Sequence, residues 1–306
     1  MTPKKILITG GTGFIGFHLA KKCLKKGWIV TSLSTTHPQK RKRLKNVSYL
    51  ICDISKKKEL KKIKNYEYDY VVNLAGYVDH SNQEKVFKVH YEGCKNLADF
   101  FLSKKIKKFI QIGSSIEYGK KSSPHHEKMK SKNTYSYYGN AKLLSTNYLL
   151  TLYKDKKFPA CILRPYLLYG PNQDFNRIIS STIQNCLSDK TFNCSEGIQY
   201  RDFLFIDDFI SVIIKVINLK STSGHIFNVG SGKKTNIKNT IKKIQKMIGK
   251  GKPKFGEIPM RKDEIMTLYP SIKKIKKFTK WKPNISFNEG LALTIKHYKK
   301  IIFKKI

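Results

Sequence analysis

The sequence predicts an α/β fold: a doubly wound parallel β-sheet joined by a smaller C-terminal lobe. Short, nearly continuous apolar runs alternate with segments of helical apolar spacing through the first two thirds of the 306 residues. This pattern is typical of parallel strands buried on both faces by helices. A glycine-rich loop directly follows the first run, and after about residue 170 the pattern becomes less regular and ends in a lysine-rich helical tail.

The elements follow in a regular order. A first strand at 5–9 precedes a helix at 16–27. Further strands are predicted at 28–34, 47–54, 68–76, 107–115 and 158–166, long helices at 84–105 and 137–155, and short strands at 200–206 and 225–230. There is no internal repeat and no Pro- or Gly-rich linker, so the second lobe is expected to be woven into the first.

The amino-acid composition limits the partners, the location and the metal sites that we expect. The net charge of +40 comes from 61 basic residues, of which only six are Arg. Since Arg is the side chain suited to base edges and the Lys residues are spread along the chain, we expect no specific nucleic-acid partner. No apolar run reaches the roughly 20 residues of a membrane helix, and no signal peptide is evident, so we expect a cytoplasmic protein without a membrane partner. The six scattered Cys residues predict buried thiols and no metal site.

Gly10, Gly13 and Gly16 stand between the first strand and the first helix. Glycines let a backbone approach a pyrophosphate closely, and a helix N-terminus offers free N–H groups and a positive dipole end. A purely structural turn is the alternative interpretation. The strand–loop–helix context favours a Rossmann-type dinucleotide site. We therefore expect residues 1–166, with about 203–230, to form the NAD(P)-binding domain, and about 167–202 with 231–306 to form the second lobe.

The end of the second strand bears on cofactor choice. NAD-preferring sites usually place Asp or Glu there, whereas this chain has Ser34 followed by a basic cluster that includes Arg41 and Arg43. Hydroxyls and guanidinium groups can bind a 2′-phosphate. The sequence therefore favours NADP(H), with NAD(H) as the alternative cofactor.

Tyr138 and Lys142 are four residues apart on a predicted helix, which places them on one face. A neighbouring ammonium favours the phenolate, so Tyr138 could exchange a proton with a sugar oxygen. With 17 Tyr in a lysine-rich chain, this spacing alone also arises by chance. Ser114, at the end of a predicted strand, supplies a hydroxyl for the same oxygen.

These motifs resemble the extended short-chain dehydrogenase/reductase family, in its nucleotide-sugar epimerase/dehydratase/reductase branch, over nearly the whole chain. The resemblance implies a catalytic trio of Ser114, Tyr138 and Lys142. It implies cofactor contacts, beyond the residues already named, from Thr12, Phe14, Ile15, Asp53, Ile54, Leu74, Ala75 and Gly76, and from Tyr138 and Lys142 themselves. It implies substrate contacts from Ser115, Arg177, Arg201 and Arg261, with the arginines gripping a diphosphate.

Four positions depart from the family pattern. Ser115 and Ile116 stand where family dehydratases carry an Asp-Glu pair, so loss of water from the sugar is not expected. Leu167 and His90 replace asparagines that are common in the family.

The leading hypothesis is a nucleoside-diphosphate-sugar oxidoreductase, a 4-keto-6-deoxysugar reductase that uses NADPH with Tyr138 as proton donor. An epimerase with tightly bound NAD is the first alternative, and a non-catalytic Rossmann binding protein is the second. A homodimer that packs the helices at 84–105 and 137–155 into a four-helix bundle is expected from the resemblance.

Overall fold

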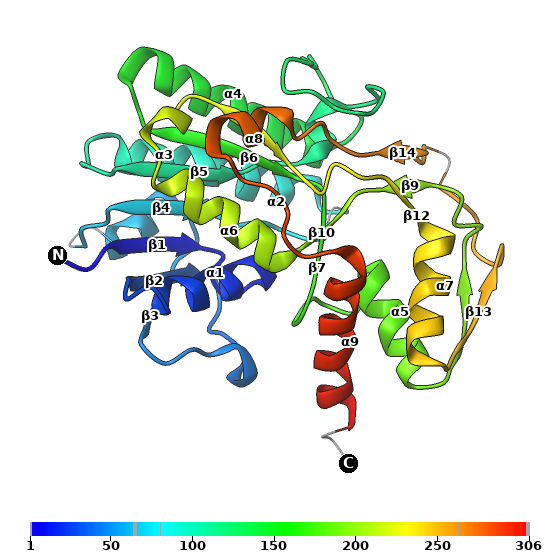
Figure 1. Ribbon diagram of the computed structural model, residues 1–306. Coiled ribbons are helices and arrows are strands. Elements are labelled where there is room, and N and C mark those ends of the chain that lie inside the picture. The colour runs from blue at the N-terminus through cyan, green and yellow to red at the C-terminus, as the bar shows by residue number, and fades with distance from the viewer. Residues whose placement is uncertain (1, 64–65, 80, 262, 304–306) are drawn as a thin grey trace.

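A seven-stranded parallel sheet forms the centre of the molecule. The computed structural model describes residues 2–63, 66–79, 81–261 and 263–303, without the side chain of Arg41. The strands of the sheet are β1 (Lys5–Thr9), β2 (Ile29–Ser34), β3 (Val47–Ile51), β4 (Tyr70–Asn73), β5 (Lys108–Ile112), β6 (Ala160–Pro165) and β11 (Ile226–Val229). Their order is β11-β6-β5-β4-β1-β2-β3. The order reverses at β1, between β4 and β2, which is where ligands bind in such sheets. The predicted doubly wound fold is confirmed (Figure 1).

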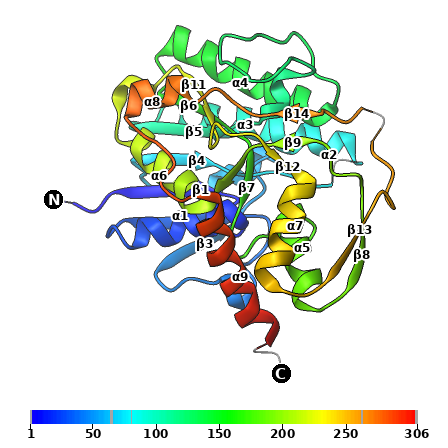
Figure 2. The same cartoon turned by 45° about the vertical axis from the view of Figure 1, so that its right-hand side comes forward.

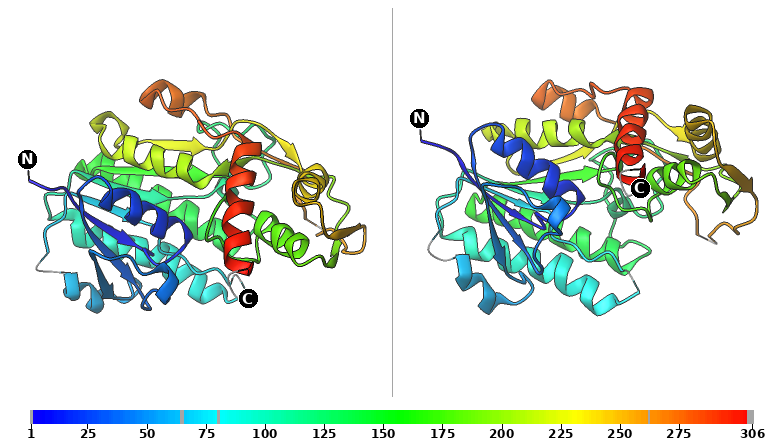
Figure 3. Two further views of the ribbon diagram at one scale, coloured as in Figure 1. Left: turned by 60° about the horizontal axis from the view of Figure 1, so that its bottom comes forward. Right: turned by 90° about the horizontal axis from the view of Figure 1, so that it is seen from below.

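Helices cover both faces of this sheet (Figure 3). On one face lie α1 (Phe14–Leu24) and α6 (Ile206–Ile217), and on the other lie α3 (Gly93–Leu102) and α4 (Tyr137–Lys156). Alternate residues of β1 serve the two faces: Ile6 and Ile8 belong to the core with α1 and α6, and Leu7 belongs to the core with α3 and α4. Burial on both faces explains why these strands are almost continuously apolar.

The helix expected at 84–105 is not uniform. It consists of α2 (Gln83–Phe87), a π-helical turn at Lys88–Glu92, and α3. The π turn carries His90, which is buried. Such turns occur often at functional sites, because the extra residue re-aims a side chain. Short 3₁₀ turns lie at Lys40–Lys42, Lys57–Ile63, Ser115–Tyr118 and Lys220–Thr222.

Most of the remaining elements gather at the carboxyl end of the sheet (Figure 2). Strand β7 (Leu167–Tyr169) pairs with β10 (Phe203–Phe205), and β8 (Thr191–Cys194) pairs with β13 (Lys252–Phe255). Strand β9 (Tyr200–Arg201) lies between β12 (Thr235–Asn236) and β14 (Thr267–Leu268). Helix α5 (Ile178–Leu187) packs against α7 (Ile237–Ile248) and α9 (Phe287–Phe303), while α8 (Lys273–Thr279) packs on β11. Contacts of α6 with both β5 and β10 join the sheet to this group.

Two further observations concern membrane-spanning helices and the cysteines. Within the described ranges, no helix has both the length and the apolar character needed to cross a bilayer. All six Cys side chains are buried and carry free thiols.

Candidate active site

The glycine loop fits a phosphate cradle. Gly10 has φ +65°, and a Cβ on it would lie 2.6 Å from the carbonyl oxygen of Leu74. A Cβ on Gly16 would collide with the carbonyl oxygen of Gly10. Gly13 is the N-cap of α1 and provides no side chain to cover the first-turn amides. The backbone amides of the first turn, which include those of Phe14 and Ile15, can therefore donate hydrogen bonds to an anion. The loop thus fits the pyrophosphate of a dinucleotide.

The end of β2 lies against this loop. The Ser34 hydroxyl accepts hydrogen bonds from the amide and the hydroxyl of Thr12, at 3.4 and 3.2 Å. Lys42 pairs with Asp174 at 3.7 Å, and the exposed Arg43 guanidinium lies over the Tyr49 ring at 5.7 Å. The side chain of Arg41 lies outside the described residues. The structure thus brings Ser34 to the loop and leaves Arg43 at the surface nearby.

Two further predicted cofactor segments follow β3 and β4. The Asp53 carboxylate accepts from the amide and hydroxyl of Ser55, which forms a tight turn, and Ile54 is buried against Gly93. After β4, the amide of Leu74 donates to the carbonyl of Thr9 and the amide of Ala75 donates to the Thr9 hydroxyl. Both segments therefore lie at the carboxyl edge of the sheet, where β1 fixes the second one.

Gly76 makes room for His90. A Cβ on Gly76 would lie 2.9 Å from Cε1 of the His90 ring, and Nε2 of that ring lies 3.2 Å from both the amide and the carbonyl oxygen of Tyr77. The His90 ring also packs edge-on against Tyr138, with centroids 4.9 Å apart. The histidine therefore joins the β4 segment to the predicted proton donor.

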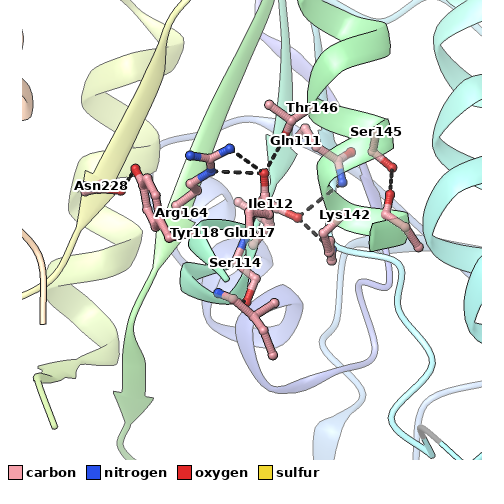
Figure 4. Close-up of polar contacts among 12 residues, drawn as sticks. Gln111, Ile112, Ser114, Glu117, Tyr118, Lys142, Ser145, Thr146, Arg164 and Asn228 are labelled. Carbon is pink, nitrogen blue, oxygen red and sulfur yellow. Dashed lines mark hydrogen bonds and ion pairs between the residues drawn. The ribbon is translucent and has the colours of Figure 1, made fainter. Parts of the chain in front are cut away.

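The three predicted catalytic residues converge. Ser136 caps α4, which begins at Tyr137, so Tyr138 and Lys142 stand on the first turns of that helix. The Ser114 hydroxyl hydrogen-bonds the Tyr138 phenol. The Lys142 ammonium lies 5.9 Å from the centre of the Tyr138 ring and donates to the carbonyl of Ile112 at 2.7 Å. Strand β5 ends at Ile112, so the sheet holds the ammonium at its carboxyl edge (Figure 4).

Burial sets the protonation of this trio. Burial raises the pKa of Tyr138, while its hydrogen bond to Ser114 and the Arg177 guanidinium lower it. The phenol is therefore neutral at neutral pH. Burial lowers the pKa of Lys142 to about 8, and the Glu117 carboxylate opposes that change. A neutral phenol beside an ammonium is a proton donor whose product phenolate is stabilised.

The predicted substrate residues divide into two groups. Ser115 is buried directly after Ser114, and Arg177 precedes α5 with an exposed side chain whose charge reaches Tyr138. Arg201 on β9 forms an ion pair with Glu264, and the charge of Arg261 acts on Arg201. The structure thus brings Arg201 and Arg261 together.

Two acidic residues, Glu117 and Glu264, have roles that were not expected from the sequence. Glu117 forms a buried ion pair with Arg164, with Oε2 2.6 Å from Nη2, and Glu264 holds Arg201. The signal for the first was an arginine inside the otherwise apolar run at 158–166, because a buried charge needs a partner. Nothing local in the sequence indicates that Glu264 lies against β9.

The comparisons with known proteins agree with this geometry. The family model described as "NAD dependent epimerase/dehydratase family" matches residues 6–230. A UDP-N-acetyl-alpha-D-glucosaminuronate decarboxylase of Bacillus cytotoxicus is 28% identical, covering 97% of this chain and 98% of the relative. A UDP-glucuronate 4-epimerase of Thermodesulfobacterium geofontis is 27% identical, covering 94% of each. The solved structure of a UDP-glucuronic acid 4-epimerase from Bacillus cereus, in complex with UDP-glucuronic acid and NAD, has a TM-score of 0.85, 26% identity, and coverage of 97% of this chain and 99% of that one. The resemblance expected from the motifs is confirmed.

Proposed function

Since the chain belongs to the NAD dependent epimerase/dehydratase family, we propose that it is an NADPH-dependent reductase of nucleoside-diphosphate 4-keto-6-deoxysugars. The observation that carries this choice is the end of β2. Ser34 there bonds Thr12 of the phosphate loop, and residues 34–45 contain no carboxylate but several cations. A carboxylate at this place would repel the 2′-phosphate of NADPH, whereas hydroxyls and cations accommodate it.

The trio has separate duties in this reaction. Tyr138 gives its proton to the oxygen of the sugar carbonyl, because its phenol is neutral and bonded to Ser114. Ser114 holds that same oxygen with its hydroxyl. Lys142, fixed by the carbonyl of Ile112, stabilises the phenolate that forms. The cofactor, when bound, supplies the hydride.

Two features fit the substrate class. Ser115 and Ile116 offer no carboxyl group to remove a proton or to protonate a leaving hydroxyl, which supports reduction without loss of water. Arg201 and Arg261 can bind a diphosphate, since guanidinium groups contact it bidentately. Arg177 contributes positive charge on the Tyr138 side.

The test uses the purified protein, NADPH or NADH, and a nucleoside-diphosphate 4-keto-6-deoxysugar made in situ by a dehydratase. We expect NADPH absorbance to fall only when the keto sugar is present, and NADH to work less well. A protein that consumes neither cofactor, tested with several nucleotide bases, would contradict the proposal.

A C4 epimerase is the second candidate, and the epimerases among the relatives favour it. Such an enzyme keeps NAD through the catalytic cycle. Stoichiometric NAD that survives dialysis, together with interconversion of two nucleotide sugars without added cofactor, would support the epimerase over the reductase.

We also propose that the protein is a homodimer through α3 and α4. Leu102 and Leu144 are 38% and 40% exposed on these helices. Light scattering should give twice the mass of the chain for the wild type, and Leu144→Asp should give a monomer, because a charge there would be desolvated in the interface.

A further inference from the structure

The carboxylate of Glu117 is bonded to three elements that meet at the trio. It accepts hydrogen bonds from the backbone amide of Ser114 and from the Thr146 hydroxyl, both at 2.7 Å. It also accepts hydrogen bonds from Nε and Nη2 of Arg164, at 3.0 and 2.6 Å. These donors come from the turn after β5, from α4 and from β6, and the Glu117 side chain is fully buried (Figure 4).

A fully buried carboxylate is energetically tolerable only when a cation and hydrogen-bond donors surround it. An isolated buried carboxylate costs several kcal/mol, and an arginine with two hydrogen bonds to it removes most of that cost. The Arg164 side chain is itself only 4% exposed, and the Glu117 charge raises its pKa above the ordinary value. The Arg164 guanidinium therefore keeps its positive charge beside the Glu117 carboxylate.

The position of Thr146 connects this pair to the catalytic face. Tyr138, Lys142 and Thr146 follow one another at intervals of four, so they share one face of α4. At its other oxygen, Glu117 closes the capping box that Ser114 opens for the turn Ser115–Tyr118. One carboxylate thus ties the Ser114 backbone to the helix face that carries the phenol and the ammonium.

We propose that Glu117, held by Arg164, is a positioning residue for the reaction: it fixes Ser114 against Tyr138 and places a negative charge against the face of α4 that carries Lys142. This inference rests on the proposed function, since it assigns a role within that site. Glu117 would not contact the substrate.

The charge of Glu117 acts on the pKa of Lys142 in a definite direction. Burial alone lowers the pKa of Lys142, and the charge of Glu117 is the largest influence that raises it, followed by Cys94 on α3. The other groups beside this site are His90 on the π turn, Tyr138 on the same helix and Arg164 on β6. Removing the Glu117 charge therefore lowers the pKa of Lys142, and the ammonium is lost at a lower pH.

The test compares Glu117→Gln with two other variants. Glu117→Gln keeps the shape of the side chain and removes the charge. Thr146→Val removes only the hydrogen bond to α4. The control is Asp99→Asn, because Asp99 on α3 also bonds α4, through the Tyr148 hydroxyl, but is not bonded to Ser114 or Arg164.

For Glu117→Gln we expect kcat to fall about a hundredfold with KM for the sugar nearly unchanged. The basic limb of its pH–rate profile should move about one pH unit towards acid. Thr146→Val should lower kcat by roughly tenfold, and leave the basic limb in place. Asp99→Asn should match the wild type in both. A folded Glu117→Gln variant with wild-type kcat, or with an unmoved basic limb, would overturn the inference.

Two further results keep the inference separate from stability and from the proposed function. Should Glu117→Gln not fold, Thr146→Val decides, and wild-type kcat in that variant refutes the positioning role. Should the wild type reduce no keto sugar, the proposed function fails. The role of Glu117 is then tested by measuring NADP⁺ binding with calorimetry over a range of pH. The Glu117→Gln variant should lose affinity for NADP⁺ at a lower pH than the wild type. An identical pH dependence of the two affinities refutes the role.

Discussion

Replacing Lys142 by methionine should give a protein that is inactive but more stable at neutral pH. Burial lowers the pKa of Lys142 from 10.5 to about 8. At about 1.4 kcal/mol per pKa unit, this corresponds to a cost of roughly 3 kcal/mol for keeping the ammonium buried. Methionine has a similar length and avoids that cost. The carbonyl of Ile112 loses its bond to Nζ, which costs about 1–3 kcal/mol. The expected net gain in the free energy of unfolding is therefore about 1 kcal/mol.

The pH dependence provides the sharper measurement. Below pH about 8 the folded and unfolded wild type both carry the proton on Lys142, so the full cost is present. As the pH rises from about 8 towards 10.5, the folded state releases that proton while the unfolded state keeps it, and the wild type gains stability relative to the variant. The advantage of Lys142→Met should therefore shrink and then reverse.

Urea unfolding of both proteins at about pH 7 and about pH 10 measures this difference. Lys154→Met serves as the matched control, because Lys154 is exposed on the same helix and its stability effect should not change with pH. A Lys142→Met variant that is less stable than the wild type by more than about 1 kcal/mol at neutral pH, or a gap that is constant with pH, would refute the reasoning.

Three other changes probe the site. Tyr138→Phe should lower kcat by about 10²–10⁴ in a steady-state assay, with cofactor affinity retained, because only the proton donor is lost; a smaller loss would point to another donor. Ser34→Asp should shift the kcat/KM ratio from NADPH towards NADH by at least about tenfold, while exposed Thr36→Asp should shift it less; equal shifts would place the 2′-phosphate elsewhere. Gly10→Ala should cost about 2 kcal/mol or more in thermal unfolding, because of its positive φ and the nearby Leu74 carbonyl; an unchanged melting temperature would contradict the tight loop.

The sheet and the tight glycine loop after β1 could be predicted because their signals are local. Apolar runs such as 5–9 must be covered on both faces, and Gly10 and Gly16 stand where a Cβ would strike the backbone. The spacing of Tyr138 and Lys142 also gives their common helix face directly.

Contacts between distant segments could not be predicted in the same way. The pairing of Glu117 with Arg164 joins residues 47 positions apart, and that of Arg201 with Glu264 joins residues 63 apart. The π turn that aims His90 at Tyr138 depends on packing between helices, because nothing in the sequence of 84–105 interrupts its helical spacing. Charge and periodicity indicate that such residues need partners, but the fold selects which ones.

The most direct test of the central claim is isotope transfer from the cofactor. NADPH carrying deuterium at the transferred position is mixed with the keto sugar, and the product is analysed by mass spectrometry and NMR. We expect one deuterium at C4 of the sugar for each NADPH consumed by the wild type, and almost none with Tyr138→Phe in the same time. A sugar that is converted without gaining deuterium, while the NADPH stays intact, would contradict the account.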